Sequence, residues 1–454
     1  MRWLLWRVFF GILYACFFQG PGWNQNSQFD SIRAIVEEGR FDITDFASNT
    51  GDVGYYDGRV YSNKLPGMSF LGAPFYWAMY RAERLVWPNP NSKPLVTTRN
   101  AYVLTFLLSG VPGVILLLIL FHHFRRRGAS TWEAFFLASA FGGGSLLLPY
   151  SGVMMNHILI ACLLFGAWHL LSGPELTPRC AAIAGLLSGL GVLTESLATP
   201  VSALFLGYLL MRNRRNAAMF LTGLIPISLL LAGYDFLCFG NIFVTDLTVE
   251  SQEFTHTGYL FGVLQWPQPM RIYWLTLHPF RGLFYCCPVL LIGLLSLRWP
   301  PRIRAASPKT LVALLVVGGF FSFNMTFNYW ASGASFGPRY LMPATPFLYS
   351  FALTGYRRFP IVSGCLAAIS AVFVLAPTAV GVMIPSVDGA PPPPLVNPVF
   401  DCIRQLLAGQ LLASSLPGKL LGLRGLWCLV PLLLVFLAFC RFAWRVRLAD
   451  KSGR

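Results

Sequence analysis

The sequence predicts an all-α polytopic membrane protein with about 12 transmembrane helices and a large first extracytoplasmic loop carrying short surface helices. Hydrophobic residues make up 55% of the 454 residues, and charged residues only 11%. Apolar runs of membrane length recur from end to end, and basic residues gather at alternate ends of these runs. We expect one membrane domain over 1–454, because the loops are too short for a separate soluble domain.

The predicted spans follow the apolar runs in chain order. The shorter runs need support from neighbouring helices or local thinning of the bilayer. Arg2 and Arg7 precede the first run, as in a signal peptide, but no small-x-small cleavage site follows. We therefore expect an uncleaved first helix. The runs lie at 3–19, 101–121, 133–150, 156–172, 180–194, 198–211, 217–237, 283–297, 310–327, 340–356, 361–382 and 425–442.

The distribution of charge predicts the orientation. With a cytoplasmic N-terminus and alternating runs, the cytoplasmic segments hold 20 of the 34 Lys and Arg residues but only 3 of the 18 Asp and Glu residues. This is the positive-inside bias of membrane proteins. It predicts a multi-pass protein of the bacterial inner (plasma) membrane with both termini in the cytoplasm. It also accounts for the net charge of +16 without a nucleic-acid partner.

Three long polar segments then face the outside, at 21–99, 239–280 and 383–424. Long loops are usually either functional or disordered. The first one places many aromatic residues beside charges, which a purely connecting loop does not need. We therefore expect function in 21–99.

The first outer loop has two helix signals. The S-x-x-D pattern at 27–30 is typical of a capping box, ahead of an amphipathic helix that ends at Gly39. We expect this helix to lie on the membrane surface with Phe29, Ile32 and their neighbours in lipid. The apolar start of 65–86 is short for a span and is expected to be interfacial or re-entrant.

Between these two helices lie T-G-D at 50–52 and Y-S-x-K-x-P-G at 61–67, where Gly and Pro mark tight turns. Lys64 could meet an anionic lipid headgroup at the membrane surface. A carboxylate such as Asp52 could take a proton from an acceptor hydroxyl or amine. The alternative is a solvated loop with turn residues at its turns.

Two residues outside this loop are further candidates. Arg339 lies in an outside turn, against the charge bias, and arginine binds phosphate in a forked geometry. It is a candidate contact to a donor phosphate, and the alternative is an interfacial anchor beside Tyr340. Glu195 lies at an outer turn between two short spans, where acids are often functional. The alternative for Glu195 is a structural hydrogen bond.

The loop motifs resemble those of the C-type membrane glycosyltransferases, the superfamily of the protein O-mannosyltransferases and the lipid A aminoarabinose transferase. The pattern is most similar to a bacterial branch with N-x-N-S, T-G-D and Y-S-x-K-x-P-G, which this chain matches at 24–27, 50–52 and 61–67. G-P-R-Y at 337–340 and R-G-L-F at 281–284 match later motifs of the same branch. The resemblance covers most of the chain as architecture, but only these motifs residue by residue.

The resemblance implies a polyprenyl-phosphate sugar as donor and a catalytic Asp in the first outer loop. Better-known members carry Asp-Glu where this chain has Asn24 and Gln25, whose amides cannot act as bases. Another acid must therefore serve. Asp52 is the first candidate because it lies in the matched T-G-D motif, and Asp30 and Asp45 follow.

The resemblance also suggests binding roles. Lys64 falls where the family places a lysine near the donor phosphate, and Arg339 is the second donor-phosphate candidate. Tyr61, Asn24 and Glu195 are the candidate substrate-binding residues. The ten cysteines form no CxxC pair and no His/Cys cluster at zinc spacing. No cofactor is expected, and an Asp-bound divalent ion stays open.

The expected function is inverting transfer of a sugar from a polyprenyl phosphate to a lipid, glycan or protein acceptor on the extracytoplasmic side. A transporter or lipid flippase is the alternative from another class. It would need charged residues or broken helices at mid-membrane, and the predicted spans are nearly free of charge at their centres. The missing Asp-Glu pair leaves a third alternative, a non-catalytic membrane assembly protein.

Overall fold

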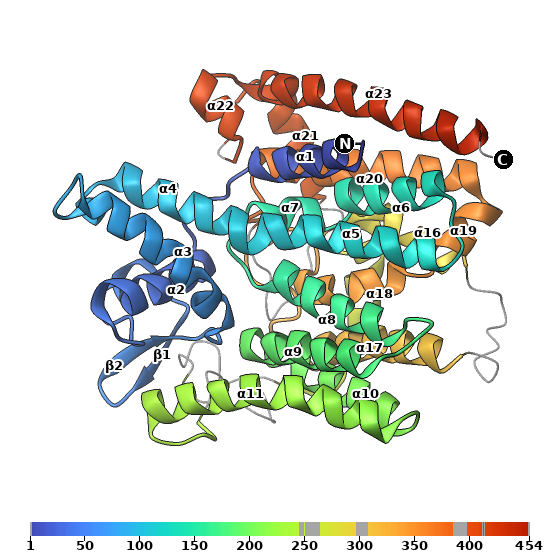
Figure 1. Ribbon diagram of the computed structural model, residues 1–454. Coiled ribbons are helices and arrows are strands. Elements are labelled where there is room, and N and C mark those ends of the chain that lie inside the picture. Colours follow the sequence, from blue (N-terminus) through green and yellow to red (C-terminus); the bar gives the residue numbers. More distant parts are fainter. Residues whose placement is uncertain are drawn as a thin grey trace. The chain divides into compact units, whose positions relative to one another are not determined.

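The computed structural model describes residues 2–244, 249, 264–296, 307–384, 397–410, 412 and 414–452. The middle of the expected outer loop 239–280 and the start of the loop 383–424 lie outside these residues. The chain forms two compact units, each assembled from separate stretches (Figure 1). The first comprises 1–19, 110–152 and 267–454, and the second comprises 20–109 and 153–266.

The first unit is built from helices. In it α1 packs beside α23, and the ring of Phe9 stacks on that of Phe439 with centroids 4.0 Å apart (Figure 1). Its elements are α1 (Arg2–Ala15), α5 (Val111–Arg126), α6 (Thr131–Gly144), α7 (Leu147–Ser151), α14 (Met270–Thr276), α15 (Leu283–Cys286), η5 (Pro288–Leu290), α16 (Leu291–Leu294), α17 (Pro308–Thr326), η7 (Arg339–Ala344), α18 (Thr345–Tyr349), α19 (Ala352–Arg358), α20 (Pro360–Val380), α21 (Pro398–Leu407), α22 (Leu416–Leu421), η8 (Gly425–Leu429) and α23 (Val430–Ser452).

The second unit combines helices with one β-hairpin and contains most of the candidate residues. Its elements are α2 (Trp23–Arg33), η1 (Ala34–Glu38), η2 (Ala47–Asn49), β1 (Val53–Tyr56), β2 (Arg59–Ser62), α3 (Gly67–Arg84), η3 (Pro90–Ser92), α4 (Pro94–Thr105), η4 (Phe106–Gly110), α8 (His157–Leu171), α9 (Pro178–Thr194), α10 (Ala198–Leu210) and α11 (Arg214–Phe239).

Helices long and apolar enough to cross a membrane are present, as expected for an integral membrane protein. By length and composition, five stretches of the described chain qualify: Pro94–Arg126, Arg214–Phe239, Pro308–Thr326, Pro360–Val380 and Gly425–Leu448. Shorter apolar helices occupy Leu4–Ala15, His157–Leu171, Pro178–Thr194 and Ala198–Leu210. A mostly helical fold with candidate membrane spans is thus observed, and the count of about 12 spans stays a prediction.

Two predicted spans are broken into short pieces. The run at 283–297 forms α15, η5 and α16 with Pro288 between them, and the run at 340–356 forms η7, α18 and α19. Pro343 lies inside η7 and Pro346 near the start of α18. Proline lacks the backbone N–H of a regular helix and clashes with the preceding turn. Hydropathy detects the apolar run but not these interruptions.

The first surface helix begins earlier than predicted. The residue before α2 is Gly22, which has an extended backbone and supplies no side-chain cap. Ser27 therefore lies inside the helix, and the capping-box prediction was wrong. The predicted stop was right, because η1 ends at Gly39 with φ of 67°.

The apolar face of α2 is buried in protein. Phe29 and Ile32 pack with Met68 and Tyr76 of α3 and with Leu104, and the Phe29 and Tyr76 rings meet edge to face at 5.7 Å. The prediction that this face lies in lipid was therefore wrong. Helix α3, expected to be only interfacial or re-entrant, supplies the covering surface.

A β-hairpin between the two helices was not predicted. β1 pairs antiparallel with β2 in a register that places Val53 opposite Ser62. Its turn holds Asp57 and Gly58 at φ of 48° and 72°, and Asp-Gly favours this left-handed hairpin turn. The register brings Asp52, which precedes Val53, beside Asn63 and Lys64, which follow Ser62.

The hairpin is fastened to the carboxyl end of α11. The Tyr56 hydroxyl donates to the Phe239 carbonyl at 2.8 Å, and the Tyr61 hydroxyl donates to the Cys238 carbonyl at 3.1 Å. Both rings also pack edge to face against Phe239. These contacts tie the first outer loop to a candidate membrane span.

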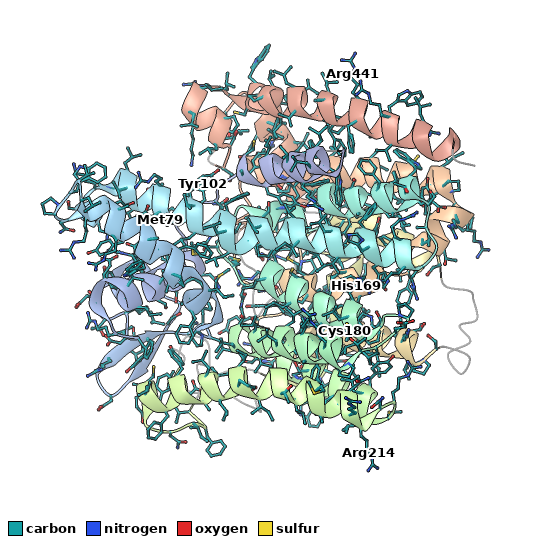
Figure 2. All side chains as sticks on the ribbon, viewed as in Figure 1. Met79, Tyr102, His169, Cys180, Arg214 and Arg441 are labelled. Atoms are coloured by element: carbon teal, nitrogen blue, oxygen red, sulfur yellow. The ribbon has the colours of Figure 1, made fainter. Side chains whose placement is uncertain are left out.

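The other end of α11 is basic. In Figure 2, His169 of α8, Cys180 of α9 and Arg214 of α11 lie toward the same end of the second unit. Asn216 also donates to the Leu176 carbonyl at 3.1 Å, which joins the start of α11 to the connection between α8 and α9. Arg212 and Arg214 are exposed at this end. Because α11 has 26 residues, it is about 39 Å long, so the hairpin and the arginines at the start of α11 lie about one bilayer thickness apart.

Gly67 at the start of α3 allows a close approach to α9. A Cβ there would lie 2.3 Å from Thr194 Oγ1 and 2.8 Å from the Leu193 carbonyl oxygen. We expect Gly67→Ala to destabilise the protein by about 1–3 kcal/mol through overpacking, measured by thermal unfolding in detergent. The control is Gly207→Ala on α10, where nothing lies within 4 Å. Equal melting temperatures for the two variants would contradict this packing.

Candidate active site

Asp52 and Lys64, both predicted from the sequence, lie side by side in the second unit. Lys64 Nζ is 3.2 Å from Asp52 Oδ2, and the two side chains are 20% and 14% exposed. An ion pair that is mostly shielded but not sealed is screened less than a surface pair and can still be reached by a ligand. The two candidate roles, acid and phosphate contact, therefore share one location.

A directed chain of hydrogen bonds fixes this pair. Ser27 Oγ donates to the Asp52 carbonyl at 2.7 Å and lies 2.7 Å from Ser62 Oγ. Each hydroxyl has one proton to give, so Ser62 donates to Ser27. Ser62 Oγ in turn accepts from the Lys64 backbone N–H at 3.1 Å. One serine from α2 and one from β2 thereby hold the backbones of the two residues that form the ion pair.

The T-G-D motif packs on the start of α2. Thr50 Oγ1 donates to the Trp23 carbonyl at 2.7 Å and accepts from the Asp52 backbone N–H at 3.1 Å. Asn26 Nδ2 donates to the Asn49 carbonyl at 2.8 Å. A Cβ on Gly51 would lie 2.8 Å from the Trp23 ring, so a larger residue at this position would displace that ring. The three loop motifs quoted from the sequence thus converge in space.

The predicted catalytic candidate Asp30 lies one helical turn after Ser27 and is 1% exposed. Its Oδ1 is 3.7 Å from Arg33 Nη1. Among the residues that the structure describes, no hydrogen-bond partner meets Oδ2. Burial raises the pKa of the Asp30 carboxyl to about 7, against the opposing effect of the Arg33 guanidinium. This acid can therefore change its charge near neutral pH.

The raised pKa of Asp30 predicts a pH dependence of stability. In the folded protein this group keeps its proton up to about pH 7, whereas the unfolded chain releases it near pH 3.9. Its contribution to stability is therefore full below about pH 3.9 and is lost as the pH rises through about 7. We expect Asp30→Asn to raise the melting temperature at pH 8 relative to wild type, by an advantage that shrinks toward pH 5. Parallel curves for the two proteins would contradict this assignment.

The structure places Asp45, the third candidate acid, in a different charged cluster. Its side chain is 65% exposed and pairs with Arg40. Arg40 also contacts Glu38 Oε2 at 2.6 Å and Asp42 Oδ1 at 3.3 Å. Asp45 thus has a partner of its own, and a catalytic role for it stays a prediction.

The three substrate-binding candidates are buried or engaged. Asn24 is 8% exposed on α2 and Tyr61 is 4% exposed, with its hydroxyl on the Cys238 carbonyl. Glu195 Oε2 accepts from Asn156 Nδ2 at 2.7 Å, directly after the Thr194 that Gly67 contacts. The structural hydrogen bond considered for Glu195 is therefore present, and contact of these residues with a substrate stays a prediction.

Arg339 belongs to the first unit, at the start of η7. It is 9% exposed, and its guanidinium lies 5.2 Å from the centre of the Tyr340 ring. Arg281 of the R-G-L-F motif is buried in the same unit, where it donates to the Ala331 carbonyl and, at 2.8 Å, to Ser335 Oγ. Both motif arginines are thus largely withdrawn from solvent.

Sequence reasoning missed the positioning role of Ser27 and Ser62. Both stand inside quoted motifs, and that membership is the signal that could have identified them. Among the described residues, no group of three His, Cys, Asp or Glu side chains lies close enough together to hold a metal ion.

Comparison with known proteins gives structural neighbours only. No protein-family model and no curated protein sequence matches the chain. The chain is similar in structure to ArnT from Cupriavidus metallidurans bound to undecaprenyl phosphate, at 14% identity and a TM-score of 0.48, with 84% of this chain and 64% of that chain covered. It is also similar to the Archaeoglobus fulgidus oligosaccharyltransferase AglB in complex with an inhibitory peptide and a dolichol-phosphate, at 13% identity and a TM-score of 0.45, with 82% and 55% covered.

The chain therefore spans between about half and two thirds of the length of these solved structures.

Proposed function

We propose that this protein is a membrane glycosyltransferase that moves a sugar from a polyprenyl-phosphate donor to an acceptor on the extracytoplasmic side. The observation that carries the proposal is the Asp52–Lys64 pair, 3.2 Å apart on a loop braced by Ser27 and Ser62. Sugar transfer from a phosphate needs a base for the acceptor and a positive charge for the leaving group. This pair supplies both.

The pair also suggests how the base is activated. When the donor phosphate approaches, Lys64 turns from the Asp52 carboxylate to the phosphate oxygens. The Asp52 carboxylate is then released from this ion pair to face the acceptor. Asp52 then takes the proton of an acceptor hydroxyl or amine as that atom bonds to the anomeric carbon. The bond from that carbon to the phosphate oxygen breaks, and its electron pair leaves with the polyprenyl phosphate.

Attack from the side opposite the phosphate inverts the anomeric centre, as expected for one displacement. The polyprenyl phosphate leaves as an intact group with its electron pair, so the step needs no redox cofactor. Arg339 stays the predicted second contact to the phosphate. The acceptor can be a lipid, glycan or protein. Running the transfer assay with and without a chelator tests whether a divalent ion is needed.

The location follows from the charge distribution. We place the protein in the bacterial inner membrane with both termini in the cytoplasm. The hairpin and the exposed Arg212 and Arg214 lie at opposite ends of α11. This is required if the candidate site is outside and these arginines are inside.

A reconstituted transfer assay tests the function. The purified protein in vesicles is given a labelled polyprenyl-phosphate sugar and envelope extract as acceptor. We expect labelled acceptor and an equal amount of free polyprenyl phosphate. Movement of the intact labelled lipid or of a solute across the vesicle membrane, without transfer, would instead identify a flippase or transporter.

A further inference from the structure

A polar hollow adjoins the T-G-D motif in the second unit. It has a volume of about 340 Å³, which lies within the range of about 300–1,000 Å³ typical of small-ligand sites. Residues 48–51 line one part of it, and Trp23, Val53 and Tyr55 complete the lining. Gly51 and Val53 are the chain neighbours of Asp52, which does not itself line the hollow.

Two aromatic side chains stand at this hollow with much of their surface open. Trp23 is 54% exposed and Tyr55 is 61% exposed, although both belong to regular elements. An aromatic ring offers a flat apolar face together with a polar edge. Exposed rings of this kind, placed beside polar groups, are suited to a ligand that has both apolar and polar faces.

The frame around Trp23 holds it in place. Thr50 Oγ1 donates to its carbonyl at 2.7 Å, and Gly51 lets the backbone pass directly against its ring. Asn26 anchors the Asn49 carbonyl at 2.8 Å. The ring is thus positioned before any ligand arrives, which lowers the entropic cost of binding.

The lining also indicates what the ligand is. Ser48 and Asn49 add a hydroxyl and an amide to this lining, whereas an acyl chain would require an apolar wall. A sugar ring matches both the aromatic and the polar parts of this lining. Its C–H face can stack on an aromatic ring while its hydroxyls bond to the polar groups. Neither charged side chains nor a wide basic surface line the hollow within the described residues, so a phosphate has no evident contact there.

We propose that this hollow binds a carbohydrate ring of the acceptor, stacked on Trp23 and Tyr55. The acceptor is then itself a glycan or glycolipid, and the atom to be glycosylated is presented toward Asp52. The inference that the bound carbohydrate belongs to the acceptor rests on the proposed transferase function. The inference that the hollow binds a carbohydrate does not.

Binding is tested on the full-length protein in nanodiscs, applied to an array of bacterial envelope oligosaccharides. We expect binding of at least one class of saccharide, weakened tenfold or more by Trp23→Ala and by Tyr55→Ala. Trp77→Ala is the matched control, because Trp77 is also 54% exposed but lies on α3 outside the hollow. Melting temperatures of all three variants show that they remain folded.

The outcomes separate this inference from the proposed function. No saccharide binding, or binding unchanged in both hollow variants, overturns the inference even if sugar transfer is observed. Binding that is unchanged in both hollow variants would leave the two rings as interfacial anchors. Saccharide binding that depends on Trp23, in a protein without transferase activity, supports the hollow and refutes the transferase.

Discussion

Asp52→Asn is expected to reduce sugar transfer by about 10²–10⁴-fold, the usual contribution of a positioned general base. The amide keeps the size of the side chain but cannot accept the acceptor's proton. The variant should still fold, because Ser27 bonds to the Asp52 backbone carbonyl rather than to its carboxylate. The measurement is the rate of label transfer in vesicles at saturating donor.

Asp45→Asn is the control for this prediction, since Asp45 lies in the same loop but is 65% exposed and paired with Arg40. Activity equal to that of wild type would exclude Asp45, the third predicted acid, as the base. Full activity of Asp52→Asn would remove Asp52 from the mechanism. If Asp30→Asn alone abolished transfer, the base would instead be the acid whose pKa lies at about 7.

Lys64→Ala is expected to weaken binding of the polyprenyl-phosphate donor by about 10- to 150-fold. This corresponds to the loss of about 1.5–3 kcal/mol for a hydrogen bond to a charged group. The rise should appear in KM for the donor, with a further fall in kcat because Lys64 also stabilises the leaving phosphate. Steady-state kinetics with varied donor concentration measure both parameters.

Two variants sharpen this result. Lys64→Arg keeps the charge and should recover part of the donor affinity. Lys93→Ala removes a lysine of the same loop that lies over the Trp87 ring, and should leave KM unchanged. An unaltered KM in Lys64→Ala would rule out the phosphate contact.

The double variant tests whether Asp52 and Lys64 act as a unit. Because their side chains are 3.2 Å apart, the two substitutions should be strongly non-additive. In the single Lys64 variant Asp52 loses its partner, and in the double variant no carboxylate is left to respond. Additive losses would show that each residue acts independently.

The amino-acid sequence by itself determined the class of protein and the outline of its helices. Long apolar runs such as 217–237 and 361–382 became α11 and α20, because a helix is the way for a continuous apolar segment to satisfy its own backbone in a membrane. Gly39 ended the first surface helix as predicted. The motif at 50–52 and the motif at 61–67 also identified the two members of the central ion pair.

Only the tertiary structure decided which of the candidate groups meet. The T-G-D motif ranked Asp52 above Asp45 but did not show what either acid meets, and the hairpin register places Asp52 against Lys64. Ser27 has the local pattern of a helix cap, but its hydroxyl bonds to residues 25 and 35 positions away. Such contacts depend on how distant segments pack, and the packing energy is not encoded in any short stretch of chain. Local patterns therefore predicted the elements and the chemistry, and long-range packing selected the site.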